Sequence, residues 1–126
     1  MNIALVDDDA ADRLGLEQML AEYARIHQLD MSFARFSSGE DLLRGYVPFR
    51  YAVIFLDIFM DGVSGIDTAK SIREVDDSTS LVFLTTSEAF RPEAFSLFAT
   101  SYLIKPCVKE QVFRRATGTV LPDGWN

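Results

Sequence analysis

Short apolar segments alternate along this chain with longer segments in which apolar residues recur at helical spacing. Four of the short segments, at 3–6, 51–56, 81–84 and 102–104, consist almost entirely of apolar residues. Such runs are typical of strands that are covered on both faces. Residues 31–36 alternate between apolar and polar, which predicts a fifth and less buried strand.

Five helices are predicted between and after these strands. The first covers 11–27, where one face carries Leu16, Met19, Leu20, Tyr23 and Ile26. A short second helix is expected from a capping box at Ser37 and Glu40 to Tyr46. A third carries Ile66, Ala69 and Ile72 on one face, a fourth begins near Pro92, and a fifth covers 108–116. Phe90, Phe95 and Phe98 are interpreted mainly as core residues of the fourth helix, with one or two rings at the surface.

Strict alternation of strands and helices predicts an α/β fold built from βαβ units around a parallel sheet. With five of each, the expected architecture is a flavodoxin-like (βα)5 doubly wound sheet with strand order 2-1-3-4-5. Ligands of such sheets bind outside the carboxyl ends of the strands, at the switch point between strands 1 and 3.

Charged residues stand where three of these strands end. Asp7, Asp8 and Asp9 follow the first strand, Asp57 follows the third and Lys105 follows the fifth. Under the expected strand order these carboxylates lie together, and their mutual repulsion favours a hard cation such as Mg²⁺, which prefers oxygen ligands. Lysine is a compact positive charge suited to a phosphoryl oxygen, so the pattern predicts a divalent-cation and phosphoryl site.

Each residue also has a purely structural interpretation. Asp7, Asp8 and Asp9 suit a helix start, where they would cap the first helix. Thr85, at the end of the fourth strand, is a common β-branched strand residue. The structural alternative for Lys105 is an ordinary surface lysine, but that description fits Lys109 better, and a cis bond to Pro106 would aim Lys105 back into the crevice.

Size, composition and charge restrict the classes of function that we expect for this protein. The 126 residues suffice for one domain, and 48% hydrophobic with 25% charged residues is ordinary for a soluble globular protein. The net charge of −7 disfavours direct binding to nucleic acid. We expect no membrane contact, because no apolar run approaches the ~20 residues of a spanning helix. A single cysteine, Cys107, and the absence of a signal-peptide pattern favour the cytoplasm.

A family resemblance rests on these same residues. Val-Asp-Asp-Asp at 6–9, Leu-Asp-Ile-Phe-Met at 56–60, Gly65, Thr85 and Tyr-Leu-Ile-Lys-Pro at 102–106 occur in order. Together they resemble the response-regulator receiver domain of two-component signalling, over about residues 1–115. The resemblance implies a protein that is not an enzyme but accepts a phosphoryl group from a sensor histidine kinase.

The resemblance also implies a role for each matched residue. Asp57 would be the phosphorylation site, and Mg²⁺ would be bound by Asp57, Asp8, the carbonyl of Phe59 and, nearby or through water, Asp7. Thr85 and Lys105 would bind the phosphoryl oxygens, and Thr85 with Tyr102 would form the switch. The switch would change a surface made by the fourth helix, fifth strand and fifth helix, which we expect to form a homodimer.

The sequence segments around Thr85, Glu93 and Tyr102 look most similar to receivers of LytTR-type transcription regulators. We therefore expect a receiver domain over 1–117 and interpret 118–126 as a tail that begins a linker to a DNA-binding domain absent from this chain. Contact with DNA, and control of transcription, would occur only through that domain.

Three residues depart from the usual pattern. Asp61 stands where many receivers have a proline, so the loop after Phe59 should be less rigid and more acidic. Phe59 is bulky and apolar two places after the acceptor, and Thr86 replaces a usual Ala or Gly, so both should slow loss of the phosphoryl group.

Two other functions remain as alternatives. One alternative is a phosphatase of the haloacid-dehalogenase type, although Phe59 stands where such enzymes have a second Asp. The other is a pseudo-receiver that serves only as an interaction module, against which the intact Asp8, Asp57 and Lys105 argue.

Overall fold

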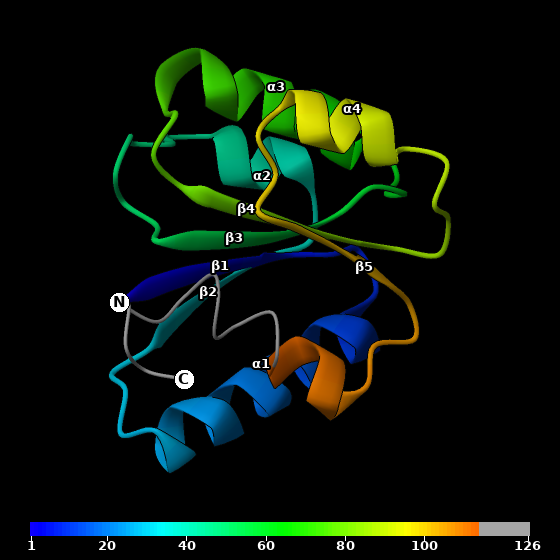
Figure 1. The fold of residues 1–126 in the computed structure, drawn as a ribbon. Coiled ribbons are helices and arrows are strands. Elements are labelled where there is room, and N and C mark those ends of the chain that lie inside the picture. Colours follow the sequence, from blue (N-terminus) through cyan, green and yellow to red (C-terminus); the bar gives the residue numbers. More distant parts are fainter. Residues whose placement is uncertain (114–126) are drawn as a thin grey trace.

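In the computed structural model, five parallel strands form one sheet with helices on both faces (Figure 1). The structure describes residues 1–113. Its elements are β1 (Asn2–Val6), α1 (Ala10–Ile26), β2 (Ser32–Phe36), α2 (Gly39–Leu43), β3 (Val53–Asp57), α3 (Gly65–Val75), β4 (Ser80–Thr85), α4 (Arg91–Ser96) and β5 (Ser101–Ile104). The strand order is β2-β1-β3-β4-β5, which confirms the predicted architecture.

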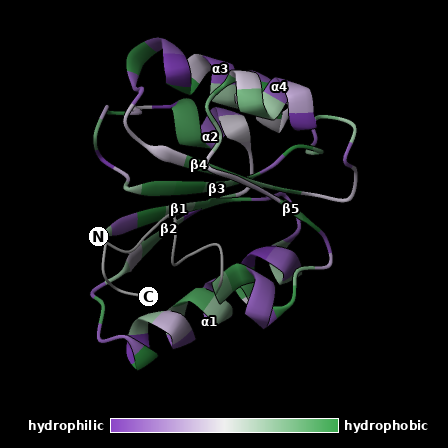
Figure 2. Cartoon of the chain, in the orientation of Figure 1, coloured by the Kyte–Doolittle hydropathy of each residue, from purple (hydrophilic) through white to green (hydrophobic). Residues whose placement is uncertain are grey.

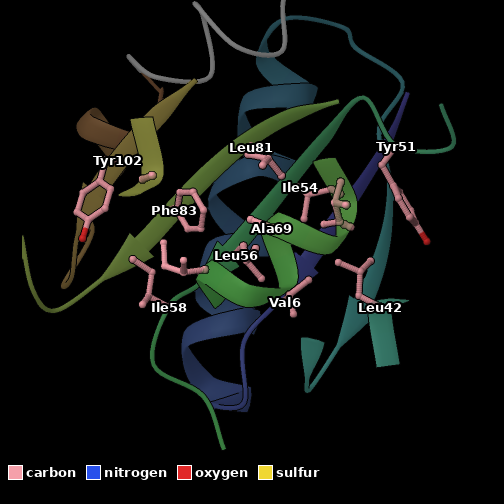
Figure 3. Packing of buried hydrophobic residues seen from close by; sticks show 14 residues of the cluster. Val6, Leu42, Tyr51, Ile54, Leu56, Ile58, Ala69, Leu81, Phe83 and Tyr102 are labelled. Atoms are coloured by element: carbon pink, nitrogen blue, oxygen red, sulfur yellow. The ribbon is translucent and has the colours of Figure 1, made fainter. Parts of the chain in front are cut away.

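The sheet separates two hydrophobic clusters because successive strand residues point to opposite faces. On β3, Ile54 and Leu56 join the cluster under α2, α3 and α4, part of which Figure 3 shows. Val53 and Phe55 join the cluster under α1. Every residue of β3 is buried, as its unbroken apolar sequence predicts. Each large apolar side chain buried in this way stabilises the fold by roughly 1.5–3 kcal/mol.

The outer strand β2 differs, since it pairs only with β1 and none of its residues is buried. Its alternating sequence thus predicted its position correctly. Figure 2 shows hydrophobic residues along β3 and most of β1, and hydrophilic residues over much of the helices. Within residues 1–113, no helix has both the length and the apolar character that crossing a bilayer requires.

Side chains cap three of the helices. The N-cap residues are Asp9 for α1, Ser38 for α2 and Ser64 for α3, and each accepts a hydrogen bond from the backbone N–H three residues on. The capping box predicted at Ser37 was therefore wrong by one residue. Helix α2 is also shorter than expected, because the chain turns at Gly45, where φ is +72°.

The interpretation of the phenylalanines near α4 was only partly correct. Phe90 packs against the core, but Phe95 is 53% exposed and Phe98 is 80% exposed. The reason is the length of α4, whose six residues bury only Ala94. Residues 109–113 are helical and belong to the predicted last helix. The rest of that helix and the tail at 118–126 lie outside the described residues.

Candidate functional site

Four charged side chains meet at the carboxyl edge of the sheet, on the right in Figure 1. Asp7 and Asp8 follow β1, Asp57 ends β3 and Lys105 follows β5. Because β1 and β3 are adjacent, one oxygen from each of Asp7, Asp8 and Asp57 lies within 4.8 Å of the others. Three hard oxygen donors at this spacing fit a divalent cation such as Mg²⁺.

The ammonium group of Lys105 contacts three carboxylates. Its Nζ lies 2.7 Å from Asp7 Oδ2, 3.0 Å from Asp12 Oδ2 and 3.2 Å from Asp57 Oδ2. The peptide bond from Lys105 to Pro106 is cis, as the sequence suggested. Asp12, in the first turn of α1, was missed by sequence reasoning, although helical spacing places it one turn after Asp8 and Asp9.

Burial and the neighbouring charges of opposite sign have opposite effects on the pKa values of Asp57 and Lys105. Burial raises the pKa of Asp57 from 3.8 to about 6, an effect that nearby Asp7 reinforces and Lys105 limits. Burial alone would lower the pKa of Lys105, but hydrogen bonds to Asp7 and Asp12 and the charge of Asp57 raise it instead. Lys105 is therefore held as a cation, and it partly neutralises a buried carboxylate that otherwise resists ionisation.

Backbone amides of the surrounding loops fix the three acidic side chains. The N–H of Asp9 donates to Asp7 Oδ1 at 2.9 Å, and the N–H of Phe59 donates to Asp57 Oδ1 at 3.2 Å. The N–H of Asp61 donates to Asp8 Oδ2 at 3.1 Å, which joins the loop after β3 to the end of β1. Of the three acids after β1, Asp9 caps α1, as the structural interpretation predicts, whereas Asp7 and Asp8 face the cluster.

Gly65 packs directly against the backbone of Asp57 and Ile58. A Cβ at this residue would lie 2.0 Å from the carbonyl oxygen of Asp57, and the Gly65 N–H donates to the carbonyl of Ile58 at 2.9 Å. Only a residue without a side chain lets α3 begin this close to the end of β3. The sequence identified Gly65 as part of a motif but did not indicate this contact.

Thr85 and Tyr102 lie on adjacent strands and are both buried. The N–H of Ser87 donates to Thr85 Oγ1 at 3.4 Å, and the Tyr102 hydroxyl donates to the carbonyl oxygen of Ser87 at 2.6 Å. The guanidinium of Arg91 lies 4.8 Å from the centre of the Tyr102 ring. Ser87 thus links a hydroxyl near the acidic cluster to an aromatic residue beside α4.

Phe59 and Thr86 lie at the periphery of the cluster. The Phe59 ring is 49% exposed and packs edge to face against Phe90, with ring centres 5.4 Å apart. Thr86 is exposed and lines a cavity of about 310 Å³ together with Asp12, Lys105 and Cys107. This cavity opens beside the acidic cluster, against apolar residues of α1.

The chain is thus an α/β protein with a doubly wound parallel sheet, and its carboxylates and lysine lie at the carboxyl ends of the strands, where such sheets bind ligands. A family model, the response regulator receiver domain, matches residues 3–117. The chain belongs to this family of two-component signalling proteins.

Curated relatives agree with the resemblance to LytTR-type receivers. The chain is 42% identical over 76 residues to the sensory transduction protein LytT of Oceanobacillus iheyensis, a match covering 59% of this chain and 31% of that protein. It is 32% identical over 112 residues to LytR of Staphylococcus epidermidis and 30% identical over 112 residues to the positive alginate biosynthesis regulatory protein of Pseudomonas aeruginosa. Each of these two matches covers 89% of this chain, and 43% and 44% of the relatives. The chain thus spans less than half the length of these relatives.

Solved structures show the same fold. The response regulatory domain of mrkE from Klebsiella pneumoniae is 23% identical, with a TM-score of 0.84 over 99% of this chain and 98% of that one. The BeF3-activated receiver domain of DrrB is 26% identical, with a TM-score of 0.74 over 94% and 96% of the two chains. Family membership favours a receiver over the phosphatase considered as an alternative.

Proposed function

We propose that this receiver accepts a phosphoryl group on Asp57 from a sensor histidine kinase. The observation that carries the proposal is the convergence of Asp7, Asp8 and Lys105 on Asp57 at the carboxyl edge of the sheet. An Asp57 oxygen attacks the phosphorus in line while the bond from phosphorus to the donor histidine nitrogen breaks, and the electron pair leaves with that nitrogen. The product is an acyl phosphate, so the protein is a phosphoryl acceptor rather than a turnover enzyme.

In this proposal Asp7, Asp8, Asp57 and the carbonyl of Phe59 hold Mg²⁺. The three carboxylate oxygens within 4.8 Å of one another support this ligand set. When bound, the cation offsets negative charge on the phosphoryl oxygens and on the carboxylates. Lys105 and the Thr85 hydroxyl would donate to the phosphoryl oxygens, since Lys105 already reaches Asp57 and Thr85 ends the adjacent strand.

Signal output in this proposal runs from Thr85 to Tyr102. A phosphoryl group that draws the Thr85 hydroxyl toward Asp57 would weaken its contact with Ser87, whose carbonyl holds Tyr102. The surface of α4, β5 and the following helix would then change its preference for partners. We infer a homodimer through this face, with Phe95 on α4 and Phe98 just after it as the exposed apolar groups available.

The proposal also covers the domain organisation of the protein and its place in the cell. We infer a receiver domain over 1–117, with 118–126 beginning a linker to a DNA-binding domain of a LytTR-type transcription regulator. The matched relatives support this inference, because each of them is more than twice as long as the region that matches this chain. DNA contact would occur only through that further domain, and the protein would act in the cytoplasm.

Incubation with acetyl phosphate and Mg²⁺, followed by intact mass measurement, tests the proposal. One added phosphoryl mass is expected for the unaltered protein, and none for Asp57→Asn. Asp67→Asn, an exposed aspartate on α3, is a matched control that should label normally. Equal labelling of Asp57→Asn and the unaltered protein would overturn the assignment of Asp57.

A further inference from the structure

Lys105 has a partner that the family resemblance did not indicate. Asp12 Oδ2 lies 3.0 Å from Lys105 Nζ, close to the 2.7 Å and 3.2 Å contacts that Asp7 and Asp57 make with the same atom. An ammonium group has three N–H bonds and accepts nothing. The three carboxylates therefore occupy all the donors of Lys105.

Asp12 is the most exposed of the three partners. Its side chain is 50% exposed, compared with 12% for Asp7 and 8% for Asp57. Water can replace Lys105 at Asp12, whereas the two buried carboxylates would lose their compensation if Lys105 withdrew from them. When Lys105 turns to another acceptor, the contact with Asp12 is thus the one that costs least to break.

We propose that Asp12 is a positioning residue that restrains Lys105 and selects against small anionic phosphodonors. This inference rests on the proposed phosphoryl transfer to Asp57. For Lys105 to donate to a phosphoryl oxygen, one of its three carboxylate contacts must break, and an interaction present before the reaction but absent in the transition state slows the step.

The charge of Asp12 acts in the same direction. Its carboxylate adds a fourth negative group beside Asp7, Asp8 and Asp57, and it lines the cavity that opens next to Lys105. An anionic donor approaching this edge is therefore repelled. Replacing Asp12 by Asn removes the negative charge and its repulsion, and it weakens the restraint because a neutral amide oxygen holds an ammonium group less strongly than a carboxylate does.

The reaction with acetyl phosphate isolates these effects from recognition of a kinase. The new bond joins an Asp57 oxygen to phosphorus, and the bond from phosphorus to the acetyl oxygen breaks. The electron pair leaves on acetate, so no further reactant and no proton are needed. Any change of rate then reflects the site itself.

The experiment compares three variants at fixed acetyl phosphate and saturating Mg²⁺, with the phosphorylated fraction followed by intact mass. We expect Asp12→Asn to be phosphorylated at least about threefold faster than the unaltered protein. Asp12→Glu, which keeps the charge, should stay close to the original rate. Asp9→Asn should accelerate the reaction much less, because Asp9 caps α1 without contacting Lys105, and Asn serves equally well as a cap.

A second measurement observes Lys105 without any phosphodonor. In ¹H–¹⁵N spectra, loss of the ion pair with Asp12 should make the Lys105 ammonium hydrogens exchange faster with water in Asp12→Asn but not in Asp9→Asn. An Asp12→Asn rate equal to or below that of the unaltered protein would overturn the inference. Equal acceleration in Asp9→Asn would assign the effect to net charge and also overturn it. A protein that is not labelled at all would instead refute the proposed function on which the inference rests.

Discussion

Thr85 and Tyr102 bind opposite sides of one backbone residue, Ser87, whose N–H donates to Thr85 Oγ1 and whose carbonyl accepts from the Tyr102 hydroxyl. The two side chains come from neighbouring strands and are both buried. In the proposed function, a displacement of the Thr85 hydroxyl would reach the aromatic ring beside α4 through this single residue. This arrangement gives a physical basis for a switch without requiring a long chain of contacts.

Removing the Thr85 hydroxyl should separate phosphorylation from the response at α4. We expect Thr85→Ala to accept one phosphoryl group on Asp57 but to lose most of the phosphorylation-dependent chemical-shift change at Tyr102 and Arg91. Thr85→Ser keeps the hydroxyl and should retain that change. A full response in Thr85→Ala would show that the signal follows another route.

Two glycine substitutions should have opposite effects on stability. Gly65→Ala places a Cβ 2.0 Å from the Asp57 carbonyl oxygen, so we expect a loss of about 1–3 kcal/mol in the free energy of unfolding. Gly15 lies within α1, and a Cβ there would meet no atom within 4 Å beyond its neighbouring residues and the helix's own backbone, so Gly15→Ala should stabilise the protein by roughly 0.5–1 kcal/mol. Denaturant unfolding measures both, and a Gly65→Ala protein as stable as Gly15→Ala would contradict the close approach.

The buried carboxylate of Asp57 should cost stability at neutral pH when no metal is present. Its pKa is raised by burial from 3.8 to about 6, so the protonated form is favoured by folding. The stabilising contribution is complete below pH 3.8 and is lost as the pH rises through about 6. In EDTA at pH 8, Asp57→Asn should therefore be more stable than the unaltered protein by on the order of 1–3 kcal/mol. Thermal unfolding at several pH values checks this, since the difference should shrink toward pH 4.

Asp76 stabilises the opposite edge of the sheet. Its carboxylate accepts hydrogen bonds from Tyr46, Phe49, Ser78 and Thr79. Burial would raise its pKa, but these hydrogen bonds outweigh burial and lower it. The resulting stability is present above the ordinary pKa of 3.8 and is lost as the pH falls below it.

We expect Asp76→Asn to destabilise the protein by about 2–4 kcal/mol at pH 7, because one oxygen surrounded by donors becomes a donor itself. Asp77→Asn, at the exposed neighbouring residue, should change stability by less than about 0.5 kcal/mol. The two variants would be compared by urea unfolding, and equal stability would show that the hydrogen bonds to Asp76 contribute little.

The lifetime of the acyl phosphate should depend on Phe59 and Thr86. Phe59 cannot hold a hydrolytic water with its side chain, and Thr86 carries two more heavy atoms than alanine beside Lys105. Small changes in the position of a reacting water have large effects on rate. We expect Phe59→Asn combined with Thr86→Ala to shorten the phosphoryl half-life at least several-fold at fixed Mg²⁺. The decay after removal of the donor, followed by intact mass, tests this, and an unchanged half-life would exclude shielding by these residues.

The sequence alone determined the sheet and the principal acidic residues of the site. Unbroken apolar runs require strands covered on both faces, and the rules for connecting parallel strands leave few orders. Once the order was predicted, Asp7, Asp8, Asp57 and Lys105 had to meet, because each stands at the carboxyl end of a strand. Local spacing was sufficient for these residues, and the structure brings them together as expected.

Only the tertiary structure decided which further residues join them. The contacts of Asp12 with Lys105, of Ser87 with both Thr85 and Tyr102, and of Gly65 with Asp57 depend on how helices and loops pack onto the sheet. The exposure of Phe95 and Phe98 likewise follows from the brevity of α4, which helical periodicity does not reveal. Periodicity identifies which residues share a face, but the partner of that face is set by long-range packing, and that packing is absent from any local stretch of sequence.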